Sequence, residues 1–490
     1  MFKRCLSAVC VCSLLLGLSS CQKLKSTLLS NDKSLYALIL EANTILPLPS
    51  THELSFTHDD KHLYLFSQEG FFITLDPVSE TAALMDRSND EVLVIEANRL
   101  QGTPFIFSDK LVLDRYADRI SITTTFFSIP SFDLVDSTNI TFYNTPQFVT
   151  ENYIYRIGNS AYTYDYRITT QDTSSRVLWM YPKGSINEIA DIPFFFLDLY
   201  EKNGTLHVIQ AYYSKESLYH VAIASSTGQI LLEEKIGEYD PEAWWETMSI
   251  YYPGKRVAWM DEAVIIQAHD RQGVYLARFS LNDDLSLKEQ WKQYYSDAPY
   301  KEDSFPTGTH NAGISKFGTE KEWVLLPVWK EKNDMGYVFD LYCIEQNTGR
   351  TLWKAENQVM RYNIEFYEMR DALVMKTDFP EENCLNAFSL STGRIIQKTQ
   401  LSPPGFNKEL WRSSTIDAFH HEHWYSFDEQ SLILTKVNPL EGSNIKTKLK
   451  IKEKVEQAHF IILQDQLFLL CLTSKDTIHN CLIYRVDGLD

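Results

Sequence analysis

The stretch Leu341-Tyr-Cys-Ile-Glu-Gln-Asn-Thr-Gly-Arg-Thr-Leu-Trp353 holds two short apolar runs on either side of a Thr-Gly turn. Glycine adopts positive φ angles without steric cost, so the turn at Gly349 lets the second run fold back beside the first as a β-hairpin. The hairpin is a repeated unit, because the same pattern recurs at 386–396, at 221–232 and, with Ser175 in place of the glycine, at 173–179.

Turn residues recur along most of the chain at a regular spacing. The spacings run from 43 to 65 residues, and most are close to the roughly 40–50 residues that one four-stranded propeller blade needs. The sequence therefore predicts an all-β fold, a β-propeller of about eight four-stranded blades, with seven or nine blades as the alternatives. The turn centres fall near residues 80, 132, 175, 228, 284, 349, 393 and 442.

The two ends of the propeller are expected to meet in one blade. The final strand-like run, 482–486, has no partner further along the chain, so we expect an N-terminal strand from 35–41 to complete its blade. Such closure leaves few open sheet edges that could pair with other chains. The propeller domain is expected to span 34–490.

The units at 341–353 and 386–396 resemble the PQQ-like β-propeller repeat. Its hallmark is an apolar strand, Thr-Gly-Lys or Thr-Gly-Arg, and a second strand that ends in tryptophan. In that family the tryptophan packs between blades, so the resemblance implies that Trp353 and Trp179 are docking residues. Several repeats of this chain lack the glycine or the tryptophan. Quinone-binding members would imply two adjacent cysteines over the cofactor; this chain has no Cys-Cys pair, and we expect no cofactor.

The N-terminus is similar to a bacterial lipoprotein signal. Lys3 and Arg4 precede a short apolar run, which ends in Leu-Ser-Ser-Cys21. The run is too short to span a bilayer comfortably, and small residues before a cysteine are typical of the site where diacylglycerol is attached. A buried N-terminal helix is the alternative. An Asp directly after the lipidated cysteine would favour retention in the inner membrane. This chain has Gln22 there, which favours the outer membrane. The expected boundaries are a signal peptide at 1–20 and a lipidated linker at 21–33.

Composition limits the partners. The chain has 65 acidic and 46 basic residues and a net charge of −19, so it is poorly suited to bind nucleic acid. Hydrophobic residues make up 44%, which is typical of a globular protein and argues against disorder. The expected partners are a membrane, reached through the N-terminal lipid, and another protein of the cell envelope.

Four cysteines follow Cys21, and none of them forms a Cys-x-x-Cys motif. An exported protein can hold a disulfide, and Cys471 and Cys481 lie in neighbouring strand-like runs, where they could face each other across a hairpin. They could equally be two small buried apolar residues, and this second interpretation is slightly favoured.

The run His420-His421-Glu422-His423 is the densest group of metal-capable side chains. In a strand, alternation would place His421 and His423 on one face and the other two on the opposite face, so only two could converge. A metal site needs three or four ligands. A polar loop that enters the next blade is therefore favoured. His310 with Asp303 or Glu302 is a weaker candidate in a long loop, and no metal site is predicted.

The segment 239–254 has paired aromatic residues flanked by carboxylates. Aromatic rings stack on sugars and paired acids can cleave them, so a carbohydrate-binding or carbohydrate-active site is one hypothesis. A loop that buries itself on the propeller also needs aromatic residues, and this interpretation is favoured. No familiar catalytic motif is present and no catalytic residue is predicted. The prediction is a non-catalytic binding or scaffolding module, whose candidate partner surface is Trp244, Trp245, Glu246, Tyr251 and Tyr252.

Overall fold

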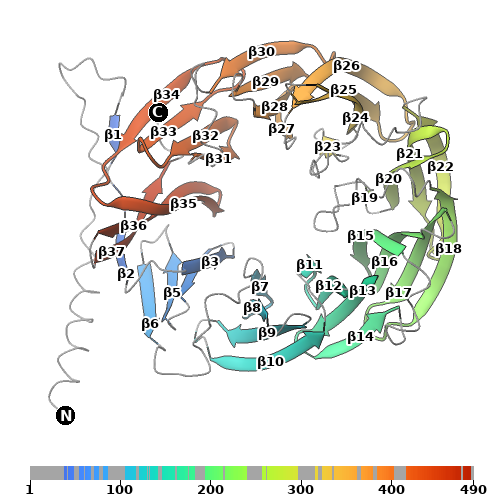
Figure 1. Ribbon diagram of the computed structural model, residues 1–490, viewed down its shortest axis with the longest axis horizontal. Helices are drawn as coiled ribbons and strands as arrows, with labels where there is room; N and C mark the ends of the chain where they lie inside the picture. Colours follow the sequence, from blue (N-terminus) through green and yellow to red (C-terminus); the bar gives the residue numbers. More distant parts are fainter. Residues whose placement is uncertain are drawn as a thin grey trace.

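The computed structural model describes residues 38–486 with gaps, of which the longest are 87–104, 183–193, 240–256, 296–314 and 402–414. Its regular elements are β-strands, and they form nine sheets arranged in a ring (Figure 1). None of the described elements is a helix of the length and apolar character needed to cross a membrane. The all-β propeller predicted from the repeat is confirmed.

Each sheet is one blade, and the blades are numbered 1 to 9 in chain order. Within a blade, consecutive strands pair in antiparallel fashion (Figure 1). Blades 1 to 3 are β3 (Leu54–His58), β4 (Leu63–Ser67), β5 (Phe71–Asp76), β6 (Thr81–Asp86); β7 (Phe105–Phe107), β8 (Lys110–Tyr116), β9 (Ser121–Ser128), β10 (Leu134–Thr141); and β11 (Pro146–Val149), β12 (Tyr153–Ser160), β13 (Thr163–Asp172), β14 (Val177–Tyr181).

The middle of the chain repeats this arrangement. Blades 4 to 6 are β15 (Phe194–Lys202), β16 (Thr205–Tyr212), β17 (Ser217–Ala224), β18 (Ile230–Glu238); β19 (Val257–Met260), β20 (Ala263–Asp270), β21 (Gly273–Leu281), β22 (Leu287–Tyr294); and β23 (Ser315–Phe317), β24 (Trp323–Asn333), β25 (Gly336–Glu345), β26 (Thr351–Met360).

The last two blades also contain N-terminal strands. Blade 7 is β27 (Phe366–Met369), β28 (Ala372–Asp378), β29 (Asn383–Ser389) and β30 (Ile395–Gln400). Blade 8 is β31 (Thr415–His420), β32 (His423–Asp428), β33 (Ile433–Val437) and β34 (Asn444–Leu449), with β1 (Leu38–Leu40) added in parallel to β34. Blade 9 is β35 (Lys454–Leu463), β36 (Gln466–Lys475), β37 (Ile478–Arg485) and β2 (Thr44–Leu48).

The closing strand is not the one predicted. β2, at 44–48, pairs with β37, whereas the predicted segment 35–41 contributes β1 to blade 8 instead. Leu48 packs in an apolar cluster shared by blades 9 and 1, so its side chain joins the last blade to the first. Pro47 has no backbone N–H to donate and is tolerated because β2 is an edge strand.

The blade count of nine corrects the expected eight and matches the stated alternative. We call the turn between the first and second strands of a blade the inner turn, and the turn between the third and fourth strands the outer turn. All eight turn centres found in the sequence fall between third and fourth strands. Blade 9 receives its fourth strand from the N-terminus, so it has no outer turn to be counted.

Tryptophans on the fourth strands join neighbouring blades, as the repeat implied. Trp353 of blade 6 donates from Nε1 to the Leu390 carbonyl in blade 7 over 2.5 Å. Trp179 makes the equivalent bond to the Ser225 carbonyl of blade 4, at 2.6 Å. A Cβ on Gly393 would lie 2.6 Å from Cδ2 of Trp353, so only glycine leaves room for the ring. Trp291, which the sequence analysis did not single out, binds the outer turn of blade 6 in the same way.

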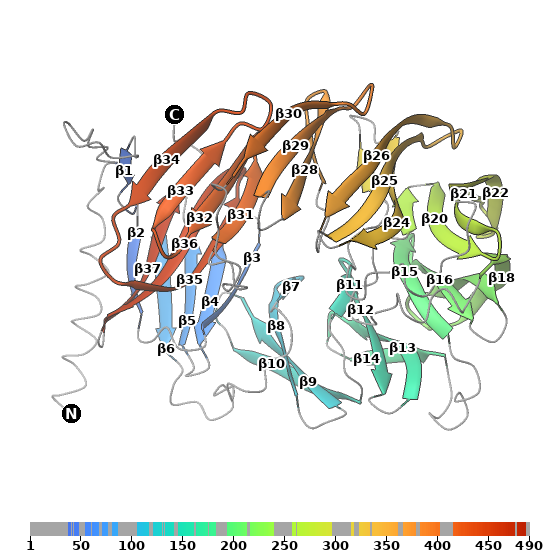
Figure 2. The same ribbon diagram turned by 45° about the horizontal axis from the view of Figure 1, so that its top comes forward.

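The inner and outer turns of a blade lie on one face of the ring, which we call the turn face. In blade 7 the Leu390 N–H donates to the Asp371 carbonyl over 3.0 Å, and in blade 4 Ser225 N–H donates to the Gly204 carbonyl over 2.9 Å. The strands of each blade run between the two faces (Figure 2). Fourth strands therefore end, and first strands begin, at the opposite face.

Candidate functional site

Several residues proposed from the sequence lie outside the part of the chain that the structure describes. The strands that flank the aromatic segment are β18 and β19, and β18 ends and β19 begins at the face opposite the turn face. The candidate partner surface and the lipid-attachment site remain predictions. The residues concerned are Cys21, Trp244, Trp245, Glu246, Tyr251, Tyr252, Glu302, Asp303 and His310.

The two C-terminal cysteines are separate buried thiols. Cys471 is opposite Leu482 and Cys481 is opposite Leu472, so the pair is offset by one residue. Alternation along a strand then sends the two side chains to opposite faces of the sheet, and they join different apolar clusters. Both are free and buried, and burial raises the pKa of Cys481 to about 12. The disulfide hypothesis is wrong, and the apolar interpretation is confirmed.

The histidine run forms the inner turn of blade 8 rather than a loop to the next blade. His420 and His423 end the two strands, while His421 and Glu422 have φ angles of 44° and 63°. Two successive positive φ angles are typical of a tight type I′ hairpin turn.

This turn contacts the inner turns on both sides. Glu422 forms an ion pair with Arg370 of blade 7, with Oε2 2.7 Å from Nη2. His421 Nε2 lies 3.4 Å from Asp465 Oδ2 of blade 9. His420, His421 and Asp465 each offer one donor atom, all within 4.8 Å of one another. The sequence analysis missed Asp465 because it grouped only ligands that lie near one another in the sequence, and Asp465 follows the histidine run by 42 residues.

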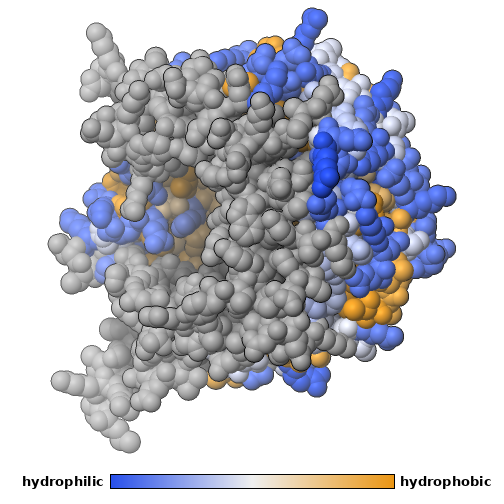
Figure 3. Space-filling model, turned by 45° about the vertical axis from the view of Figure 1, so that its right-hand side comes forward, coloured by the Kyte–Doolittle hydropathy of each residue, from blue (hydrophilic) through white to orange (hydrophobic). Residues whose placement is uncertain are grey.

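Exposed apolar pairs occur at one position of the repeat. Ile395 and Ile396 are 50% and 54% exposed, and Ile230 and Leu231 are 46% and 45% exposed. Each pair follows the glycine of an outer turn by two and three residues, next to the turn face. We call these four residues the outer-strand apolar pairs. Figure 3 shows apolar areas among hydrophilic ones on the described surface. Other exposed apolar residues on fourth strands are Ile45, Leu134, Val135, Val177 and Met180.

The fold does not require an apolar residue at the first of these two positions. In blade 6 that residue is Thr351, and the second is Leu352, which is half-buried against an apolar cluster of blades 6 and 7. Polar side chains at an exposed position cost nothing in core packing, so the two isoleucines of blade 7 are not explained by the propeller itself.

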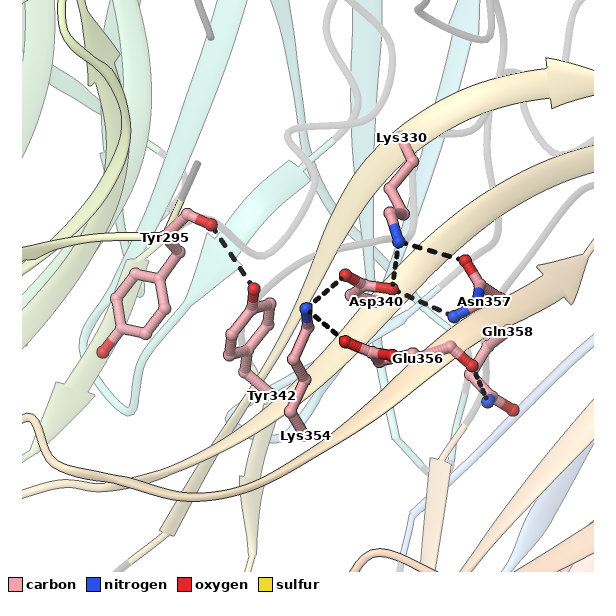
Figure 4. Close-up of polar contacts among 8 residues, drawn as sticks. All are labelled: Tyr295, Lys330, Asp340, Tyr342, Lys354, Glu356, Asn357 and Gln358. Atoms are coloured by element: carbon pink, nitrogen blue, oxygen red, sulfur yellow. Dashed lines mark hydrogen bonds and ion pairs between the residues drawn. The ribbon is translucent and has the colours of Figure 1, made fainter. Parts of the chain in front are cut away.

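A polar cluster joins β24, β25 and β26, the second, third and fourth strands of blade 6 (Figure 4). Asp340 is 4% exposed, and its carboxylate lies 3.1 Å from Lys330 Nζ and 2.8 Å from Lys354 Nζ. It also accepts the N–H of Asn357, where β26 bulges. Burial raises the pKa of Asp340, but the hydrogen bonds from Lys354, Asn357 and Lys330 outweigh burial and hold it below the ordinary value. This network of ion pairs and hydrogen bonds around Asp340 holds the bulge of β26 in place.

A buried histidine pair lies at the side of blade 4 that faces blade 5. His207 Nδ1 is 3.0 Å from His220 Nε2, and His220 Nδ1 is 3.0 Å from Glu234 Oε1. The two imidazoles are 1% and 0% exposed, and burial lowers the pKa of each to about 4. Both rings are therefore neutral near pH 7. Of the two nitrogens that face each other, His207 Nδ1 and His220 Nε2, one then donates a hydrogen bond and the other accepts it.

This pair predicts a loss of stability in mild acid. An unfolded histidine has a pKa near 6.5, so below that pH the unfolded chain binds protons that the folded chain excludes. The free energy of unfolding should fall from about pH 6.5 towards pH 4, by about 1.4 kcal/mol for each unit of pKa difference. Denaturant titrations at a series of pH values measure it. His220→Gln removes one titrating group and should flatten the slope; an unchanged slope contradicts the prediction.

Comparisons with known proteins add only distant similarities. No protein-family model matches the chain, and neither does any curated protein sequence. BamB from Moraxella catarrhalis is 10% identical, over 90% of this chain and 99% of that one, with a TM-score of 0.40. Sqt1 from Saccharomyces cerevisiae is 9% identical, over 90% and 98%, with a TM-score of 0.41. The dihydro-heme d1 dehydrogenase NirN is 10% identical, over 81% and 75%, with a TM-score of 0.40. The propeller assignment rests on the sheets themselves.

Proposed function

We propose that the protein is a lipid-anchored β-propeller of the bacterial cell envelope that binds another protein and acts as a scaffold. The observation that carries this proposal is the exposure of the outer-strand apolar pairs at equivalent positions of blades 4 and 7. Fully burying an exposed aliphatic side chain is worth about 1.5–3 kcal/mol, so covering the exposed half of one of these side chains is worth about half as much. A partner that covers a pair therefore gains free energy that the isolated propeller does not use.

The surroundings of the pairs favour a protein partner. Ile395 and Ile396 are flanked by the exposed residues Arg394 and Lys398, and Ile230 and Leu231 by Gln229 and Glu233. An apolar centre with a polar and charged rim is the usual anatomy of a protein–protein interface. The small size of each centre suits a partner that contacts several blades.

The anchor part of the proposal rests on the sequence. A lipid on Cys21 would hold the propeller at a membrane surface, with the outer membrane favoured by Gln22. The first described strand is β1, so the N-terminal segment joins the ring at blades 8 and 9. The carbohydrate alternative at 239–254 stays a prediction.

The partner is tested by a double substitution in blade 7. Ile395→Asp with Ile396→Asp places two charges in the centre of one pair and should abolish recovery of the crosslinked partner from membranes extracted in mild detergent. The free energy of unfolding should stay nearly unchanged, since both side chains are already half exposed or more. The measurement is quantitative copurification after mild crosslinking.

Blade 6 supplies the matched control. Thr351→Asp changes the equivalent position of a blade that lacks an exposed apolar pair, and the partner should still be recovered. Recovery of no partner with the unmodified protein, or equal recovery with the blade 7 variant, contradicts the scaffold proposal.

A further inference from the structure

The inner turns of blades 8 and 9 bring together three side chains that suit a metal ion. His420, His421 and Asp465 present donor atoms that all lie within 4.8 Å of one another. The imidazole rings of His420 and His421 have centroids 3.8 Å apart. Two imidazoles and a carboxylate, with water in the fourth position, are a ligand set that proteins use for zinc.

We propose that His420, His421 and Asp465 bind one zinc ion that links blade 8 to blade 9. Tetrahedral zinc with bonds of 2.0–2.1 Å holds its donor atoms about 3.3 Å apart. The 3.4 Å between His421 Nε2 and Asp465 Oδ2 already fits this spacing. The donor atoms of the cluster lie at most 4.8 Å apart, so rotation of the exposed side chains of His421 and Asp465 would have to close at most about 1.5 Å to reach the zinc spacing.

Burial and backbone geometry prepare the site. His420 is 6% exposed, so packing against its neighbours fixes its ring before any ion arrives. The side chains of His421 and Asp465 are 54% and 80% exposed, which leaves a path for the ion and room for water. Both exposed ligands sit in tight turns with φ angles of 44° and 58°, so their backbone positions are restricted.

The charges around the site also suit a cation. Arg370, from the neighbouring inner turn, is engaged by Glu422 with its Nη2 2.7 Å from Oε2, so its positive charge is compensated. Asp465 supplies the negative charge for the ion. Because the ligands come from two blades, only the folded ring presents the site, and zinc binding would stabilise the contact between blade 8 and the closing blade.

Zinc titration of the full chain tests the proposal. The protein, purified in detergent without a polyhistidine tag and stripped with a chelator, should bind one equivalent of zinc in isothermal calorimetry. Titration with cobalt should produce a visible absorption band that saturates at about one equivalent of the metal. His421→Asn and Asp465→Asn should each weaken zinc binding at least about tenfold. Loss of a group that only supports a metal ligand already costs about tenfold or more in affinity, and loss of a ligand itself should cost no less. Asparagine tolerates positive φ angles, so both variants keep their turns.

His423→Gln is the matched control, because His423 lies in the same hairpin but outside the cluster. It should bind zinc with unchanged affinity. The proposal is overturned if the unmodified protein shows no saturable zinc binding, if both asparagine variants retain full affinity, or if only His423→Gln loses it.

Discussion

Trp353→Ala is expected to lower the free energy of unfolding by about 3–5 kcal/mol, the usual cost of removing a large buried aromatic side chain. The ring of Trp353 is 7% exposed and fills the space above Gly393 of the next blade. Its Nε1–H also bonds to the Leu390 carbonyl, which loses its partner in the variant. Denaturant unfolding followed by circular dichroism measures the change.

Two further variants separate packing from hydrogen bonding at this contact. Trp353→Phe keeps an aromatic ring but removes the Nε1–H, and should cost about 1 kcal/mol through the lost hydrogen bond, plus the smaller ring volume. Gly393→Ala introduces a Cβ that collides with Trp353, at a φ of +66°. It should cost less in the Trp353→Ala background, where only the backbone strain of about 1–2 kcal/mol remains. Equal costs in both backgrounds would show that the ring and the glycine do not contact each other.

Cys21→Ser is expected to abolish lipid attachment entirely. Thioether formation needs the thiol of the cysteine that follows the apolar run and its small residues, and a serine hydroxyl does not replace it. The variant should take up no labelled palmitate. Its signal should also stay uncleaved by the lipoprotein peptidase, because the cysteine that would carry the lipid is absent.

Cys12→Ser is the control for this prediction, because Cys12 lies inside the apolar run and has no role in attachment. Its labelling should match that of the unmodified protein. Palmitate uptake by Cys21→Ser, with unchanged fractionation, would show that the N-terminus is a retained segment and that the localisation proposal is wrong.

The parts of the fold that repeat locally could be predicted from the sequence. Gly349 and Gly393 mark hairpins because the turns need positive φ angles at these positions. A few adjacent residues suffice to show this need for glycine. The docking role of Trp353 also followed from the repeat. The ninth blade did not, because its fourth strand lies at the other end of the chain and produces no turn signal.

Contacts that depend on strand register, or on residues of a neighbouring blade outside the repeat motif, were harder to predict. A disulfide between Cys471 and Cys481, the less favoured of two interpretations, failed by one residue of register, which local patterns do not fix. The metal-capable group was missed for a related reason: His421 meets Asp465 only because their turns belong to neighbouring blades. The exposure of Ile395 and Ile396 likewise depends on the position of the fourth strand at the edge of its sheet.

The pairing of β2 with β37 sets an order in time. β2 begins at residue 44 and its partner at residue 478, so β2 must wait for a strand that is synthesised more than 400 residues after it. Contacts this distant in sequence form late, because the entropy of closing so long a loop must be overcome first. Until β37 arrives, blade 9 cannot form and one side of the apolar cluster of blade 1 stays open to water. Until β37 has been synthesised, the propeller is therefore an open arc with exposed apolar surface at both ends, and this is the stage at which a chaperone is most needed.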